Sequence, residues 1–229
     1  MKRTFILLLC LGMFARLGSA APVPLDVKKL VVFIYAQDSA TNVIPDGTGF
    51  LVALPSDTIT NRISGYLVTA KHVVCPEKTW LPDIVIRVNR NDGTSEQIHL
   101  PLIPSGASKN VFVHDDSTVD VAVVPLFLPV ERFNVRYVSK DLLTTTNDFN
   151  SLGIHEGSDV FFPGMFVPHL GKKQNLPIVR FGRVAMISDE KVNWFGEGTD
   201  LYLPLSGHHL LSRSFEGFLE NRFNFSVND

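Results

Sequence analysis

The sequence has very little cysteine: only Cys10 and Cys75 occur in 229 residues. Cys10 lies in an N-terminal apolar stretch that we expect to be removed on export, which leaves Cys75 alone. One cysteine cannot form an internal disulfide, so the fold has to rest on the packing of its core. We predict a buried, unreactive Cys75; a reactive thiol is the less favoured alternative.

Patterns that bind metals, phosphates or nucleic acids are also missing. The seven histidines form no His-x-x-x-His pair and no Cys/His set with ligand spacing, so no metal site is predicted. The sequence contains neither a glycine-rich phosphate loop nor a basic patch with interleaved aromatic residues. We therefore expect no cofactor and no nucleic-acid partner.

No apolar run reaches the roughly 20 residues that a membrane-spanning helix needs. The uncharged stretch that follows Lys2-Arg3 ends at Arg16, and the small residues Gly18-Ser19-Ala20-Ala21 come next. A basic start, a short apolar stretch and a small-residue exit are typical of a secretory signal peptide. The sequence predicts a signal peptide over residues 1–20 and a secreted or periplasmic protein without stable membrane insertion after cleavage.

The remainder of the chain is rich in short apolar runs. An apolar fraction of 45% and a charged fraction of 19% fit a globular protein with a sizeable core. The runs are rich in Val, Ile and Phe and are separated by Gly, Pro, Asn and Asp, which predicts strands and turns. The segment Asn91-Asp92-Gly93 joins two of these runs as a hairpin. The expected strands are 30–36, 49–54, 65–70, 84–89, 97–102 and 121–126.

This spacing, without a convincing amphipathic helix, predicts an all-β fold with a sandwich or barrel. We assign residues 26–130 to a first β-barrel. Residues 131–150 are polar and poorly periodic, and we interpret them as a connector. Residues 151–229 form a shorter second half, with expected strands at 159–162, 178–187 and 201–203. Its last segment, 210–229, shows no strand pattern and is either a helix or poorly ordered.

Two residues tied to these strands could perform acid–base chemistry. His72 follows the apolar run that ends in Thr69-Ala70, and Asp120 begins the run Val121-Ala122-Val123-Val124. Imidazole is suited to take a proton near neutral pH, and a carboxylate can fix its tautomer and stabilise the imidazolium. Taken singly, a half-buried histidine and a strand-start cap are the favoured explanations; taken together, with Gly47-Thr48-Gly49-Phe50 ahead of them, the two residues are more specific for function.

Three segments together resemble the trypsin-like (chymotrypsin-fold) serine peptidases, and most closely the disulfide-free microbial secreted or periplasmic type. They are Gly47-Thr48-Gly49-Phe50, then Leu67-Val68-Thr69-Ala70-Lys71-His72-Val73, then Val119-Asp120-Val121-Ala122-Val123. The resemblance extends from about residue 29 to about residue 203. It implies two six-stranded barrels with a site between them, and peptide-bond hydrolysis through an acyl-enzyme. His72 then matches the general base, and Asp120 matches the acid that orients it.

The nucleophile of that family is expected in Gly-x-Ser-Gly, and this motif does not occur. Ser214-Phe215-Glu216-Gly217 resembles the usual lead-in, but Leu219 stands where the serine should be and Glu220 replaces the following glycine. The second barrel is therefore expected to be truncated or divergent, through a shifted reading frame, a mispredicted gene end or true decay. Three nearby serines could be considered as replacement nucleophiles, but each lacks the glycine spacing of a nucleophile turn: Ser206, Ser212 and Ser214.

The sequence therefore predicts a trypsin-like serine endopeptidase family member that is inactive as this chain stands. The alternative is a non-catalytic protein of the same fold that binds a peptide or a protein. An unstable remnant without activity is a third interpretation. In the first two cases the expected partner is a peptide or protein, as substrate or as ligand.

Overall fold

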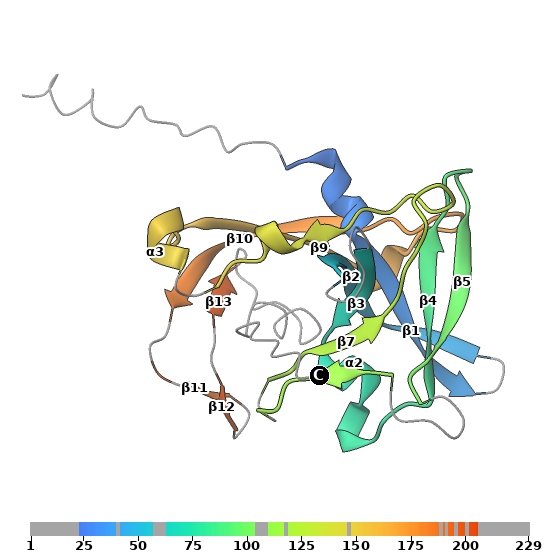
Figure 1. The fold of residues 1–229 in the computed structure, drawn as a ribbon, viewed down its shortest axis with the longest axis horizontal. Coiled ribbons are helices and arrows are strands. Elements are labelled where there is room, and N and C mark those ends of the chain that lie inside the picture. Colours follow the sequence, from blue (N-terminus) through green and yellow to red (C-terminus); the bar gives the residue numbers. More distant parts are fainter. Residues whose placement is uncertain are drawn as a thin grey trace, which may run out of the picture.

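A computed structural model describes residues 23–39, 42–56, 63–103, 110–116, 119–145, 148–187, 190, 192–194, 197–199 and 202–205. The expected signal peptide and the segment after residue 205 lie outside these residues. The fold is mostly β, with antiparallel sheets (Figure 1). No helix of the described ranges is long and apolar enough to cross a membrane.

The first half of the chain forms an eight-stranded sheet, in which seven strands follow the order β5-β4-β1-β2-β3-β7-β6 and β8 pairs in parallel with β2. The six expected strands are present as β1 to β5 and β7, and the predicted hairpin is confirmed as the antiparallel pair β4–β5. No pairing in the described ranges joins β5 to β6, so closure into a barrel stays a prediction. The bounds are β1 (Val31–Ser39), β2 (Asn42–Pro55), β3 (Ile63–Thr69), β4 (Asp83–Asn89), β5 (Ser95–Pro101), β6 (Phe112–Val113), β7 (Ala122–Pro125) and β8 (Val138–Ser139).

The centre of this sheet is buried on both faces. Successive side chains of a strand point to opposite faces, and on β1 both sets are shielded from solvent. Val32 and Ile34 belong to the main core, whereas Phe33 and Tyr35 pack with Met165 from the second half. Residues 31–36 of β1 therefore form a continuous apolar run rather than an alternating pattern.

Short helices connect the strands. They are η1 (Leu25–Leu30), α2 (Lys71–Val74), η2 (Pro76–Lys78), η3 (Lys140–Leu142), α3 (Phe149–Leu152) and η5 (Val167–His169). The stretch 131–150, expected as a connector, carries β8, η3 and the beginning of α3. Its Phe133 and Val135 are buried in the main core. This stretch therefore contributes to the packing of the first sheet.

The second half forms a three-stranded sheet in the order β13-β10-β9 and a separate hairpin of β11 and β12. The bounds are β9 (Asp159–Gly164), β10 (Ile178–Ile187), β11 (Val192–Trp194), β12 (Glu197–Thr199) and β13 (Tyr202–Leu205). The strands expected at 159–162, 178–187 and 201–203 correspond to β9, β10 and β13. Residues 165–177, between β9 and β10, are called the docking segment below.

The docking segment holds the second half against strand β4. The Arg87 guanidinium donates to the carbonyls of Gly171 and Lys172, both at 2.9 Å. The Asn175 N–H donates to Asn89 Oδ1 at 2.6 Å, and Asn89 Nδ2 donates back to the Asn175 carbonyl at 3.0 Å. The two halves are thus joined by directional contacts as well as by apolar packing around Met165.

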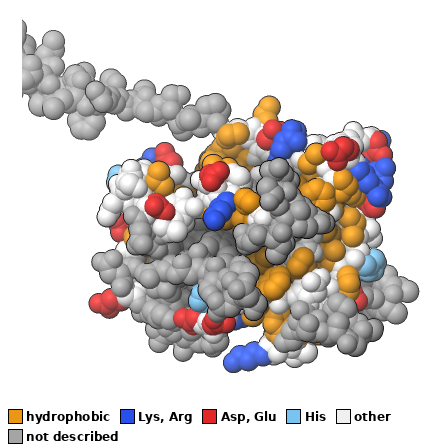
Figure 2. Space-filling model, in the orientation of Figure 1, with side chains coloured by type: hydrophobic (Ala, Val, Ile, Leu, Met, Phe, Trp, Pro, Cys, Tyr) orange, Lys and Arg blue, Asp and Glu red, His pale blue; other side chains and the backbone are white. Residues whose placement is uncertain are grey.

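Large hydrophobic side chains also reach the surface. Figure 2 shows hydrophobic side chains at the surface beside the segments drawn in grey. Phe112 is 57% exposed, Phe127 61% and Phe181 62%. Phe112 and Phe127 lie in the region of the first sheet, and Phe181 lies on β10.

Candidate active site

The register of two neighbouring strands brings His72 and Asp120 together. In the antiparallel pair β3–β7, Thr69 lies opposite Ala122. Lys71 comes two residues after Thr69, and Asp120 comes two residues before Ala122. The two therefore lie side by side, and the Lys71 N–H donates to the Asp120 carbonyl at 3.2 Å. Residues 48 positions apart in sequence therefore become neighbours because the strands that precede and follow them are paired.

The helix α2 fixes the position of His72. Val73 and Val74 of this helix are 2% and 0% exposed and belong to the main core. The His72 side chain, by contrast, is 45% exposed. Because the two valines hold the short helix in the core, the imidazole stands at the surface on a rigid support.

The Asp120 carboxylate contacts His72 at two points. Its Oδ1 accepts the His72 backbone N–H at 2.9 Å, and its Oδ2 lies 2.5 Å from Nδ1 of the ring. An ionised carboxylate can only accept hydrogen bonds, so this contact places the proton of the neutral ring on Nδ1. The lone pair at Nε2 then points away from Asp120, as a general base requires.

Thr48 links the site to both halves of the molecule. Thr69 Oγ1 donates to the Thr48 carbonyl at 3.2 Å, and the Met165 N–H donates to Thr48 Oγ1 at 3.0 Å. Glycines flank Thr48 because the neighbouring strand approaches closely: a Cβ at Gly49 would lie 2.4 Å from Leu67 Cδ1. The motif Gly47-Thr48-Gly49 therefore has a packing role beside the site.

Asp46, whose side chain is exposed, interacts electrostatically with His72, and the sequence analysis missed this. The segment Pro45-Asp46-Gly47 has the composition of a turn, but it lies inside strand β2. Desolvation raises the pKa of the Asp46 carboxyl, while the attraction of His72 acts in the opposite direction. A Pro-Asp-Gly sequence is typical of turns and gave no signal for a carboxylate beside His72.

The serines considered as nucleophiles, Ser206, Ser212 and Ser214, lie outside the described residues. So do Gly217 and Leu219, and the nucleophile side of the site therefore stays a prediction. The structure brings together His72 and Asp120. The catalytic roles of these two residues also stay predictions.

Cys75 follows α2, and its backbone N–H donates to the Lys71 carbonyl at 2.8 Å. Its thiol is free and the residue is half-buried, so the prediction of a buried Cys75 was wrong. The residue comes directly after the four-residue helix, where burial of the chain is incomplete. Within the described ranges no group of three or more His, Cys, Asp or Glu side chains could hold a metal ion.

No protein-family model matches the chain, and no curated protein matches it in sequence. Among solved structures, the chain is similar to the protease domain of MamO from Magnetospirillum magneticum in its apo form. The TM-score is 0.49 and the identity 19%, over 85% of this chain and 78% of the MamO chain. This likeness is too distant to assign an activity.

Proposed function

We propose that this protein is of the trypsin-like serine endopeptidase type, with His72 as general base and Asp120 as the acid that orients it. The observation that carries the proposal is the double contact of Asp120 with His72, at 2.9 Å to the backbone N–H and 2.5 Å to Nδ1. A surface ion pair between mobile side chains would not need the backbone contact. The two together fix both the position and the tautomer of the imidazole.

In this mechanism Nε2 of His72 removes the proton of a serine hydroxyl as the hydroxyl attacks the peptide carbonyl. The imidazolium that forms keeps its Nδ1–H bonded to Asp120, whose negative charge stabilises it. The same imidazolium then donates its proton to the leaving amine. In this proposal His72 and Asp120 supply the parts of the cycle that handle protons.

We further propose that the 229-residue chain does not complete the reaction. Its sequence contains no Gly-x-Ser-Gly, and Leu219 occupies the position of the nucleophile. Without an activated hydroxyl no acyl-enzyme can form, and loss of a triad member costs several orders of magnitude in rate. The site then keeps a base without its nucleophile.

Labelling with a fluorophosphonate probe, followed by mass spectrometry, tests both parts of this proposal. Wild-type protein is compared with His72→Ala, and with Cys75→Ala to exclude a thiol adduct. We expect no serine adduct on the well-folded wild type. An adduct on Ser206, Ser212 or Ser214 that disappears in His72→Ala would establish a working hydrolase and overturn the proposed inactivity. An adduct that persists in His72→Ala would contradict the role of His72.

A second function, binding of a peptide or protein without cleavage, is favoured by the replacement of the nucleophile with an apolar residue. The sequence Gly217-Phe218-Leu219-Glu220 keeps the first glycine of the motif but no hydroxyl. Titration of a fluorescent peptide library, followed by anisotropy, tests it. Saturable binding with intact peptide recovered afterwards would support this function, and absence of binding to every peptide would contradict it.

We also propose export by the N-terminal signal peptide. The basic start, short apolar stretch and small-residue exit at Ala20 support it. N-terminal sequencing of the protein recovered from the medium or periplasm should begin at Ala21. Full-length protein retained in the cytoplasm would contradict export.

A further inference from the structure

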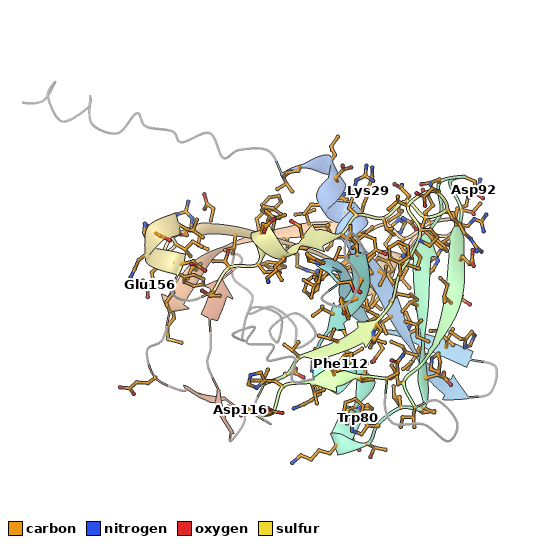
Figure 3. The ribbon with its side chains drawn as sticks, in the orientation of Figure 1. Lys29, Trp80, Asp92, Phe112, Asp116 and Glu156 are labelled. Carbon is orange, nitrogen blue, oxygen red and sulfur yellow. The ribbon has the colours of Figure 1, made fainter. Side chains whose placement is uncertain are left out.

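Asp120 lies in the loop that joins β6 to β7, two residues before the first strand pairing of β7. This loop, called the Asp120 loop below, spans residues 114–121, and the structure describes all of it except 117 and 118. Figure 3 shows Asp116 in this loop, beyond the end of the first sheet. Strand pairing alone therefore does not fix the carboxylate that contacts His72.

One side of the Asp120 loop is anchored by burial. Val119 and Val121 are both 8% exposed and pack in the same apolar cluster as Val68 of β3. Asp120 lies between the two valines, and its carbonyl accepts the Lys71 N–H at 3.2 Å. The valines therefore hold the backbone on both sides of Asp120.

The other side of the Asp120 loop is held by a histidine ring. Nδ1 of His114 accepts the Asp116 backbone N–H at 3.0 Å. The Asp116 carbonyl in turn accepts the Val119 N–H at 3.1 Å. His114 is half-buried, whereas Asp115 beside it is exposed. The two hydrogen bonds connect the His114 ring to the residue directly before Asp120.

The hydrogen bond that His114 accepts determines where its proton lies. A ring nitrogen that accepts a hydrogen bond carries no proton, so the proton of the neutral His114 ring is on Nε2. His72 has the opposite arrangement, because its Nδ1 carries the proton toward Asp120. His114 therefore contributes an acceptor, and not a charge, to the Asp120 loop.

We propose that His114 is a positioning residue for Asp120, because its Nδ1 fixes the loop from which the Asp120 carboxylate reaches His72. The inference rests on the proposed function, in which Asp120 keeps one orientation while His72 gains and loses a proton. The carboxylate contacts His72 at 2.9 Å and 2.5 Å, and both contacts require the Asp120 loop to keep its place. Hydrogen bonds behind a catalytic pair commonly hold it in its productive geometry.

Two variants separate the acceptor of His114 from its ring. His114→Phe keeps a ring and removes the acceptor, whereas the Oδ1 of His114→Asn can accept the N–H two residues further on, as in an Asx-turn. The readout is the downfield Nδ1 proton signal of His72 in the full chain, assigned by its absence in His72→Ala. We expect His114→Phe to lose this signal and His114→Asn to keep it. Exchange of the Val119 amide should rise about fivefold in His114→Phe, because its partner Asp116 is released.

His155→Leu is the matched control for the loss of a contact between a histidine ring and the backbone. Nδ1 of His155 lies 2.9 Å from the Glu156 carbonyl, in the loop between α3 and β9 of the second half. This variant should leave the His72 signal unchanged. His114→Leu replaces His114→Phe should the latter not fold. Urea unfolding of each variant shows whether a lost signal comes from the loop or from unfolding.

The experiment requires no turnover, so its failure is distinguishable from failure of the proposed function. A kept His72 signal in the folded protein without the acceptor would overturn the inference. Loss of the signal in folded His114→Asn would also overturn it, because the ring and not the acceptor would then matter. A ¹⁵N spectrum that places the His114 proton on Nδ1 would contradict it directly. Absence of the His72 signal from the wild type would instead contradict the proposed function, and the Val119 exchange would still test the loop.

Discussion

The region that carries His72 and Asp120 contains nearly all of the buried apolar side chains of the described residues, whereas strands β9 and β10 contribute very few. All described buried hydrophobic side chains except Phe162 and Met165 lie between residues 31 and 135. In the second region, Phe161 and Phe181 face each other across β9 and β10 and are 42% and 62% exposed. Burial of apolar side chains therefore contributes more to the packing of the first region than to that of the second.

This difference indicates which parts of the site are autonomous. The contact between His72 and Asp120 follows from the β3–β7 register and from the burial of Val73 and Val74. None of these contacts involves the second region. The base side of the proposed site should therefore persist when the second region is disturbed, and each prediction below tests a part of that statement.

The largest expected effect is in the core of the first region. Leu67→Ala should lower the free energy of unfolding by about 2–5 kcal/mol, because Leu67 is fully buried on the central strand β3. Phe181→Ala on β10 should change it by no more than about 0.5 kcal/mol, since its ring is largely exposed. Urea unfolding followed by circular dichroism measures both. Equal losses for the two variants would show that Phe181 is covered and would break the comparison.

The next effect concerns the docking segment. Gly171 has φ of +86°, and a Cβ there would lie 2.1 Å from the Gln174 carbonyl oxygen. Gly171→Ala should therefore cost about 1–3 kcal/mol through backbone strain and displace the carbonyl that Arg87 binds. We expect increased amide exchange in residues 165–177 while the downfield Nδ1 proton of His72 is kept. Loss of that proton would mean that the base side depends on the second region.

Gly47→Ala tests the contact between β2 and α2. Its added methyl would be driven against the rigid, buried Val73. Overpacking of this kind costs about 1–3 kcal/mol, and here it should also shift the Nδ1 proton signal of His72. Gly93→Ala is a useful contrast, because it has a positive φ of 83° but nothing within 4 Å of the added Cβ. A silent His72 signal in Gly47→Ala would contradict the close packing of β2 against α2.

Much of the first region could be predicted from sequence because its signals are local. Asn91-Asp92-Gly93 identified the hairpin, since Gly93 adopts the positive φ that the turn needs and Asp92 accepts the Thr94 N–H at 3.0 Å. The contact of His72 with Asp120 was also expected. The resemblance to a known family supplied it, and the strand register now gives its physical basis.

Other features depend on tertiary contacts that no short pattern reveals. Pro45-Asp46-Gly47 has the composition of a turn, yet pairing with β1 on both sides keeps it in a strand as a bulge. Phe133 lies in a polar stretch and is nevertheless buried in the main core. In the second region, strands β9, β10 and β13 were expected from their apolar runs, but the docking of Asn175 on Asn89 left no trace in the pattern.

The smallest expected effect is at the rim of the first region, where Glu96 on β5 accepts hydrogen bonds from Arg132 at 2.7 Å and Arg90 at 2.8 Å. The hydrogen bond from Arg132 is the main influence that lowers the pKa of this carboxyl, and Arg90 adds to it. A lowered folded-state pKa means that the pairing stabilises the protein above the ordinary pKa and is lost as pH falls through the folded value. Glu96→Gln should therefore be slightly less stable than the wild type at pH 7 and indistinguishable from it at low pH.

The difference at pH 7 should also shrink in 1 M NaCl, because salt screens charges at the surface. Unfolding at both pH values and both salt concentrations measures it, with Asp141→Asn as a control that removes a charge outside this network. A loss for Glu96→Gln as large as that of Leu67→Ala would mean that charge pairing at the rim, and not burial, maintains the first region. A loss that is small and sensitive to salt would place the stability of the support for His72 in the apolar core beneath α2.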